Sequence, residues 1–149
     1  MADRPLVHTI GFTKTSAQSF FDRLASAGVK LVLDVRLHNT SQLAGFAKAD
    51  DLAFFLKKIA NIDYRHMSIL APEDAMLSDY KKRGGAWAAY ETQFMELMSQ
   101  RKIEDKLDPN ILNGACLLCS EHTPHRCHRR LVCEYLNAKW HNRLSIKHL

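Results

Sequence analysis

The chain has 149 residues, of which 46% are hydrophobic, so one folded domain with its own core is expected and global disorder is excluded. The formal net charge of +5 at pH 7 is a moderate excess that favours anionic partners, either small molecules such as phosphates or nucleic acid. No apolar run approaches the ~20 residues needed to cross a bilayer, and no basic segment followed by an apolar one opens the chain. We therefore expect neither a membrane protein nor a secretory signal.

Hydrophobic patterning predicts strands and helices in alternation. In chain order, it predicts a strand at 6–10, a helix from Ser16 to a stop at Gly28, a strand at 29–35, a loop at 38–45, a helix capped by Asp50 or Asp51, a strand at 62–66, helices at 72–83 and 87–98, a strand at 115–119, a helix from Thr123-Pro124 to about 138, and a last strand or ordered tail at 145–149. An apolar stripe on the helix at 87–98 is interpreted as core.

This β-α-β-α-β-α-α-β-α-β order predicts an α/β fold with a mainly parallel open sheet and helices on both faces. The pattern shows no repeat and no linker, so residues 1–149 are expected to form a single domain. In such a sheet, ligands bind at the carboxyl ends of the strands.

Candidate binding and catalytic residues lie at or just after the predicted strand ends. They are Gly11, Thr13, Asp34, Arg36, His66, Cys119 and Glu121, together with Cys127, His128 and Arg129 at the predicted start of the last long helix. We expect Asp34, Glu121, Cys127 and Arg129 to line one pocket, with Arg36 and Cys119 nearby. A buried carboxylate there would need an arginine as its partner.

All four cysteines lie in the last quarter of the chain, and without a secretory signal we interpret them as reduced thiols of a cytoplasmic protein. Cys116 and Cys119 are three apart on a strand, so they point to opposite faces, and Cys116 is expected in the core, as is Cys133. Cys127 is expected in the first turn of a helix, beside arginines, where a lowered pKa and faster reaction with thiol reagents than Cys116 are predicted.

Two of these residues also have an ordinary structural interpretation. His128 falls on the apolar side of its helix, where a histidine is often a hydrogen-bonded core residue. Asp34 could simply cap a loop, or it could hold an arginine or a histidine in the site.

Several stretches together resemble the bacterial and archaeal family called domain of unknown function 488. They are Thr9-Ile10-Gly11-Phe12-Thr13, Asp34-Val35-Arg36, Leu70-Ala71-Pro72, Leu117-Leu118-Cys119-Ser120-Glu121, Pro124 with Cys127-His128-Arg129-Arg130-Leu131-Val132, and the terminal Ile146-Lys147-His148-Leu149. The resemblance implies a shared site but no known substrate. Many members continue Asp-Val-Arg with a Pro and then Ser-Arg, where this chain has Asn39-Thr40-Ser41-Gln42. If that missing arginine binds an anion in relatives, this chain relies on Arg36 or binds its ligand differently.

Three functions remain open. The first is a cysteine-centred enzyme acting on a phosphate-bearing or nucleotide-like substrate, with Cys127 or Cys119 as nucleophile, Glu121 or His128 as acid/base group, and Arg129, Arg36, Asp34, Gly11 and Thr13 around an anion. The second is a zinc site of Cys119, Cys127 and His128, with Glu121 or His66 as a further ligand. Against it, neighbours on a helix diverge by about 100°. The third is a non-catalytic nucleic-acid-binding module.

Overall fold

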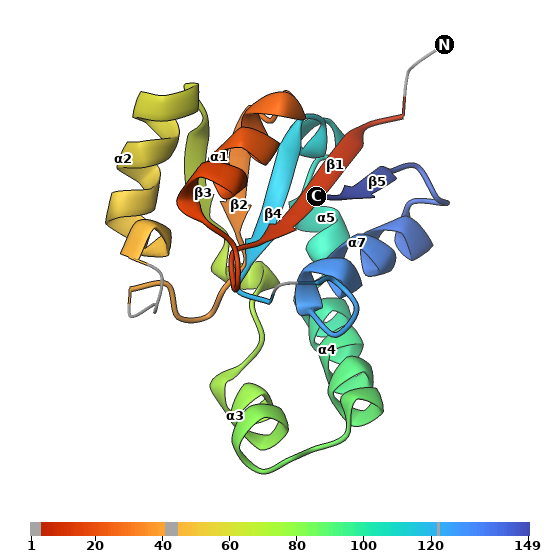
Figure 1. Cartoon of the computed structure of the whole chain (residues 1–149). Helices are drawn as coiled ribbons and strands as arrows, with labels where there is room; N and C mark the ends of the chain where they lie inside the picture. Colours follow the sequence, from red (N-terminus) through yellow and green to blue (C-terminus); the bar gives the residue numbers. More distant parts are fainter. Residues whose placement is uncertain (1–3, 41–44, 122) are drawn as a thin grey trace.

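The structure, a computed structural model, describes residues 4–40, 45–121 and 123–149. Its centre is a five-stranded sheet (Figure 1). All paired strands run parallel, in the order β3-β2-β4-β1-β5. The strands are β1 (Leu6–Gly11), β2 (Leu31–Asp34), β3 (Asp63–His66), β4 (Ala115–Cys119) and β5 (Ser145–His148). The predicted α/β fold with an open parallel sheet is confirmed.

Helices are interleaved with the strands. They are α1 (Ala17–Ser26), α2 (Ala49–Ala60), α3 (Asp74–Lys82), α4 (Trp87–Arg101), α5 (Ile103–Lys106), α6 (Pro109–Leu112) and α7 (His128–Lys139), with short 3-10 turns at Gly45–Ala47 and Ser68–Leu70. In Figure 1, α1 and α2 cover one face of the sheet, and α4, α5 and α7 cover the other. No helix among the described residues has the length and apolar character needed to cross a membrane.

The two faces of the sheet carry two separate cores, because side chains alternate along each strand. The face under α1 and α2 is rich in phenylalanine and contains Cys116. The opposite face, under α4 and α7, contains Cys119, Cys127 and Cys133. Cys116 and Cys119 therefore point to opposite faces, and Cys116 and Cys133 are core thiols, as predicted.

Several helices differ from the sequence-based expectation. The helix α2 begins two or three residues earlier than the predicted cap at Asp50 or Asp51 implies, so Lys48 is its N-cap. Asp50 and Asp51 lie in its first turn, where they face the positive end of the helix dipole. The short helices α5 and α6 were not predicted. The helix α7 begins at His128 rather than at Pro124, because residues 123–126 form bends and turns.

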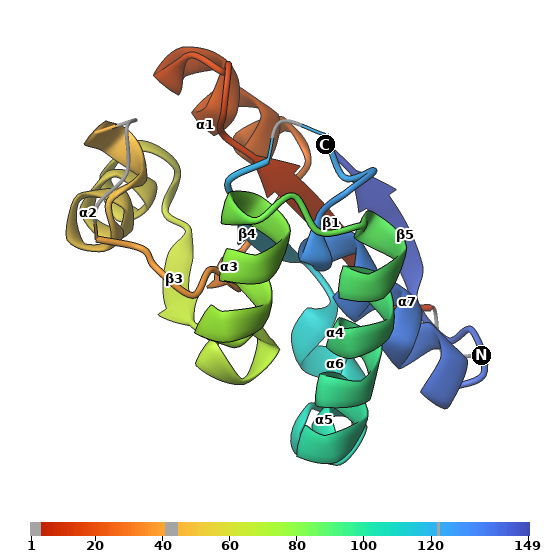
Figure 2. The same ribbon diagram turned by 90° about the horizontal axis from the view of Figure 1, so that it is seen from below.

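The register brings the strand ends to one edge of the sheet. Gly11 of β1 pairs with Cys119 of β4, and Asp34 of β2 pairs with Leu118 of β4 on one side and with His66 of β3 on the other. Figure 2, seen from below this edge, shows α3 lying in front of it. The site is built between this edge, α3, and the start of α7.

Candidate functional site

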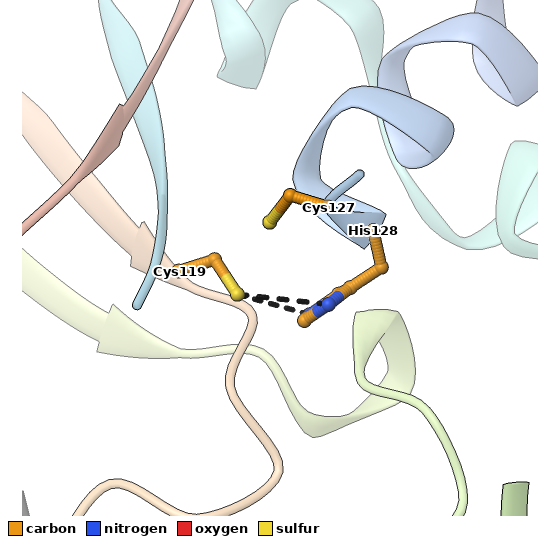
Figure 3. A group of neighbouring side chains, drawn as sticks. All are labelled: Cys119, Cys127 and His128. Carbon is orange, nitrogen blue, oxygen red and sulfur yellow. Dashed lines mark hydrogen bonds between the residues drawn. The ribbon is translucent and has the colours of Figure 1, made fainter. Parts of the chain in front are cut away.

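Three side chains from two elements converge where β4 ends and α7 begins. The sulfur atoms of Cys119 and Cys127 and a ring nitrogen of His128 all lie within 4.8 Å of one another, and all three residues are buried (Figure 3). The Cys119 Sγ atom is 3.6 Å from His128 Nδ1 and 3.8 Å from Nε2. The cluster thus offers two sulfur ligands and one imidazole nitrogen, with nearly no exposure to water.

The backbone at Cys127 explains how adjacent residues can point to the same place. Cys127 is the N-cap of α7, and its φ of −141° and ψ of 139° are those of an extended chain. The divergence of about 100° between neighbours applies only inside a helix. The argument that the Cys127-His128 pair opposes a shared metal site was therefore wrong.

Hydrogen bonding fixes the protonation of the His128 ring. Its Nε2 atom is 2.7 Å from the carbonyl oxygen of Val35, and because a carbonyl only accepts, Nε2 must carry the proton. In the neutral ring, Nδ1 is then the atom with a free lone pair. Phe94 packs against the ring, with 5.5 Å between centroids, so His128 is both a core residue and a member of the cluster.

The guanidinium of Arg129 is fully buried and lies next to Cys127 of the cluster. Its Nη1 donates to the Glu121 carbonyl oxygen at 2.7 Å and lies 3.5 Å from Cys127 Sγ, and its Nε reaches the Thr9 hydroxyl at 3.4 Å. Within the described ranges Arg129 forms no ion pair, and its Nη2 has no hydrogen-bond partner. A buried cation of this kind strongly favours a nearby anion.

The environment of the cluster favours the thiolate form of Cys119. A hydrogen bond from Cys127 and the charges of His128 and Arg129 hold the pKa of Cys119 well below its ordinary value, against the opposing effect of burial. Burial and the neighbouring Cys119 raise the pKa of Cys127 instead. The prediction that Cys127 has the lowered pKa was therefore wrong, because burial raises the pKa of Cys127 by more than the charge of Arg129 lowers it.

Burial and neighbouring charges also shift the pKa values of His128 and of the other two cysteines. Burial lowers the pKa of His128, but the charge of Cys119 and the hydrogen bonds to Cys119 and Val35 together raise it by more, so the net direction is upward. Burial raises the pKa of Cys116, and it raises that of Cys133 to about 12. These two core thiols are electrostatically unlike Cys119.

Asp34 and Arg36 form a buried ion pair at the end of β2. Arg36 donates from Nε and Nη2 to the two carboxylate oxygens, each at 2.8 Å, and the Tyr64 hydroxyl donates to Asp34 at 2.5 Å. Burial raises the pKa of Asp34, but the hydrogen bonds and charge of Arg36 lower it by more. The pair leaves the Nη1 atom of Arg36 buried without a hydrogen-bond partner among the described residues.

A cavity of about 200 Å³ adjoins the cluster. Its lining comprises Arg36, Leu37, His38, Pro72, Leu77, Tyr80, Lys81, Trp87, Tyr90, Cys119, Ser120, Glu121, Arg126, Cys127 and His128. The expected pocket is thus found in part. Glu121, Cys127, Arg36 and Cys119 line it, whereas Asp34 and Arg129 are fully buried and lie outside its lining.

Gly11, Thr13 and His66 do not line this cavity. A Cβ atom on Gly11 would lie 1.6 Å from the Glu121 carbonyl oxygen, so glycine is needed there for close backbone approach. Thr13 donates from its backbone N–H, at 3.0 Å, and its hydroxyl, at 2.6 Å, to the Ser120 carbonyl oxygen. The His66 ring binds the Arg36 carbonyl oxygen at 2.8 Å and is not part of the sulfur cluster.

Sequence reasoning missed the wall formed by α3 and α4. Tyr80, Lys81, Trp87 and Tyr90 line the cavity, and Lys81 forms an ion pair with Glu121. The apolar stripe on α4 was assigned to the core alone, but Tyr90 belongs to the core and to the cavity. The available signal was the grouping of Tyr80, Lys81 and Trp87 on either side of the Gly84-Gly85 break. The family difference at Ser41-Gln42 lies outside the described residues.

A family model, described as domain of unknown function DUF488, matches residues 16–136. The chain therefore belongs to this family, which has no assigned function. Neither the curated proteins nor the solved structures include a match to the chain.

Proposed function

We propose that this protein is a cysteine-centred, metal-dependent enzyme in which Cys119, Cys127 and His128 hold one zinc ion beside the cavity. Its substrate is anionic, in the class of phosphate-bearing or nucleotide-like molecules. The observation that carries the proposal is the convergence of two sulfur atoms and a ring nitrogen within 4.8 Å in a buried site. The free thiols fit a cytoplasmic location, where cysteines stay reduced.

The spacing of the donors suits a tetrahedral ion. With Zn–S and Zn–N bonds of about 2.3 and 2.05 Å, the sulfur-to-nitrogen edge of the tetrahedron is about 3.6 Å. The distance from Cys119 Sγ to His128 Nδ1 is 3.6 Å. The hydrogen bond from His128 Nε2 to the Val35 carbonyl is also the kind that orients a metal-bound imidazole and leaves Nδ1 for the metal.

Three protein ligands leave a fourth position, which is the usual arrangement of catalytic zinc. An ion there can polarise a carbonyl or phosphoryl oxygen, or lower the pKa of bound water to about 7. Two thiolates neutralise the ion, so the charge of Arg129 favours an anion in the same region. Glu121, which lines the cavity, is the carboxylate available for proton transfer.

Metal analysis of the purified protein, followed by titration of metal-free protein with zinc and cobalt, tests this proposal. One equivalent of zinc is expected, with the thiolate-to-cobalt absorption of a tetrahedral site. Cys119→Ser or His128→Ala should weaken zinc binding at least about 100-fold, since even supporting residues change affinity by about 10–100-fold. Cys133→Ser, at another buried cysteine on α7, is the matched control and should bind normally. Failure of wild-type protein to bind either metal would refute the proposal.

A second candidate is a thiolate enzyme without metal, and the lowered pKa of Cys119 favours it. Cys119 would be the nucleophile, and His128 the proton donor and acceptor. Metal-free protein that binds no zinc but reacts rapidly at Cys119 would support this candidate. The nucleic-acid-binding module has the least support, because the cavity and its buried thiols contribute nothing to binding an extended polyanion.

A further inference from the structure

Aromatic rings from α3 and α4 form part of the cavity lining beside the cysteine cluster. Trp87 lies nearly parallel to Tyr90, with 5.3 Å between ring centroids and 25° between planes, and Tyr80 is 5.1 Å from Tyr90. Tyr90 is buried, whereas Tyr80 and Trp87 are partly exposed. Partly exposed rings in a cavity provide surfaces on which another flat ring can stack.

Cations with unused donors line the same cavity. Arg36 is 3% exposed and its Nη1 atom has no hydrogen-bond partner within the described residues. Arg126 is exposed, lines the cavity, and forms no ion pair in the described part of the chain. Lys81, in contrast, is already paired with Glu121. Two arginines are therefore available for an anion.

We infer that the cavity binds a small planar aromatic or heteroaromatic ring that carries one phosphate or carboxylate group. The ring stacks on Trp87 and Tyr80. The anionic group binds Arg126, whose guanidinium is suited to bidentate contacts with such oxyanions, and the unused Nη1 donor of Arg36. The cavity of about 200 Å³ is smaller than the range of about 300–1,000 Å³ typical of drug-sized ligands, which favours a single ring over a dinucleotide.

The inference names the substrate class of the proposed enzyme and rests on that proposal for its catalytic consequence. The binding residues, however, are separate from the three sulfur and nitrogen ligands. Ring stacking and arginine contacts should therefore act in metal-free protein as well as in zinc-loaded protein. This separation makes the two ideas independently testable.

Phenylphosphonate is a suitable probe, because its C–P bond resists hydrolysis and it joins the ring to the anion. Methylphosphonate supplies the anion alone, and benzyl alcohol supplies the ring alone. Isothermal titration of metal-free and zinc-loaded protein should show saturable binding of phenylphosphonate, at least about tenfold tighter than either half, because each contact adds its own free energy. Absence of saturable phenylphosphonate binding in both forms would overturn the inference.

Variants assign the two contacts. Arg126→Gln should weaken phenylphosphonate and methylphosphonate binding about tenfold, the loss of roughly one charge-assisted hydrogen bond. Trp87→Leu should weaken phenylphosphonate and benzyl alcohol but not methylphosphonate. Arg143→Gln and Trp140→Leu, which lie outside the cavity lining, are matched controls, and circular dichroism checks the fold. Unchanged phenylphosphonate affinity in both cavity variants would also contradict the inference.

The outcomes separate the two proposals. Zinc binding at the cluster without phenylphosphonate binding overturns the inference and leaves the metal site intact. Phenylphosphonate binding through Arg126 and Trp87 in a protein that takes up no zinc overturns the metal proposal and leaves the ligand class intact. Absence of both refutes both.

Discussion

Arg36 and Arg129 are two buried guanidiniums near the same cluster, and they are balanced in different ways. Arg36 forms two hydrogen bonds of 2.8 Å with the Asp34 carboxylate. Arg129 contacts only a carbonyl, a hydroxyl and a thiol, and no carboxylate among the described residues. The charge of Arg36 is balanced by Asp34, although its Nη1 donor stays unused, whereas Arg129 needs a thiolate or a bound anion as its counter-charge.

This difference separates the part of the site that holds the structure from the part that is available for chemistry. The Asp34–Arg36 pair fixes the end of β2 whatever the cluster binds. Arg129 instead makes the folded state favour negative charge on Cys119, or on a ligand beside it. A variant that removes the charge of Asp34 or Arg36 should therefore mainly lower stability, whereas one that removes the charge of Arg129 should mainly change thiol reactivity.

The largest effect is expected for Asp34→Asn, which leaves the Arg36 charge buried and unpaired. The free energy of unfolding should fall by about 3–5 kcal/mol at pH 7. Because the folded-state pKa of Asp34 lies below its ordinary value of 3.8, the carboxylate stabilises the fold above that pH. The difference between wild type and variant should therefore shrink as the pH falls below 3.8 and through the lowered pKa.

Urea denaturation at a series of pH values measures this difference. Asp22→Asn, at an exposed aspartate on α1, is the control and should change stability by less than about 0.5 kcal/mol. A loss at Asp34 that is constant down to pH 2 would show that the buried ion pair is not its source.

The next effect is on thiol reactivity in metal-free protein. Cys119 should react with iodoacetamide at least about 100-fold faster than Cys116 at pH 7, because their pKa values are shifted in opposite directions and only the thiolate is nucleophilic. Cys127 should label more slowly than Cys119 because its own pKa is raised. Peptide mass spectrometry across a pH series gives the rates. Equal slow labelling of Cys119 and Cys116 would contradict the assignment of the thiolate.

Gly11→Ala tests the close approach that supplies Arg129 with its carbonyl partner. The new methyl group would meet the Glu121 carbonyl oxygen at 1.6 Å and Arg129 Nη1 at 2.9 Å, so the loop after β4 must move. We expect a loss of about 1–3 kcal/mol in the free energy of unfolding, as for other overpacked sites. Gly45→Ala, whose Cβ would meet nothing within 4 Å, is the control. Equal stabilities of the two variants would show that this contact relaxes freely.

A smaller loss of stability is expected for Arg129→Met in metal-free protein, no more than about 1.5 kcal/mol. The variant loses hydrogen bonds, but it also removes an uncompensated buried charge, and apolar replacement of buried ions is often tolerated. Arg36→Met is the matched comparison and should cost more, because it leaves Asp34 buried without its cation. Chemical denaturation of both variants tests the contrast directly. A greater loss at Arg129 would show that Arg129 is mainly structural.

The parallel sheet could be predicted from the sequence, because buried strands separated by amphipathic helices are compatible with few other folds. The sequence also located the cluster, since Cys119 and the start of α7 follow a strand that must end at the ligand-binding edge. The backbone of Cys127 could not be predicted. Pro124 after Thr123 is a good helix start by local rules, but hydrogen bonds from Thr13 and Arg129 hold the preceding loop residues Ser120 and Glu121.

Two other features depend on contacts between residues far apart in the sequence, which local sequence patterns cannot predict. The four-residue helices α5 and α6 are too short to form by intrinsic propensity, and packing of Ile103 and Leu112 into the core stabilises them. The aromatic wall of the cavity could not be predicted either, because the alternation of strands and helices does not specify that α3 lies beyond the edge of the sheet. Arg101 contributes to this arrangement by donating to the Ile69 and Ala71 carbonyl oxygens ahead of α3.

The smallest effect is expected for Lys81→Gln, which breaks the ion pair with Glu121. The two side chains are 46% and 40% exposed, and exposed pairs contribute little because water and salt screen them. We expect a change of no more than about 0.5 kcal/mol in the free energy of unfolding, similar to that for Lys57→Gln, whose partner Asp63 is also exposed. The backbone of Glu121 is held by Arg129 rather than by Lys81, so the cluster should keep its metal affinity and its thiol reactivity. Urea denaturation, zinc titration and alkylation on one preparation would measure all three. A loss above about 1.5 kcal/mol would place Lys81 with the buried charges, and it would show that α3 is held against the sheet edge by more than a surface contact.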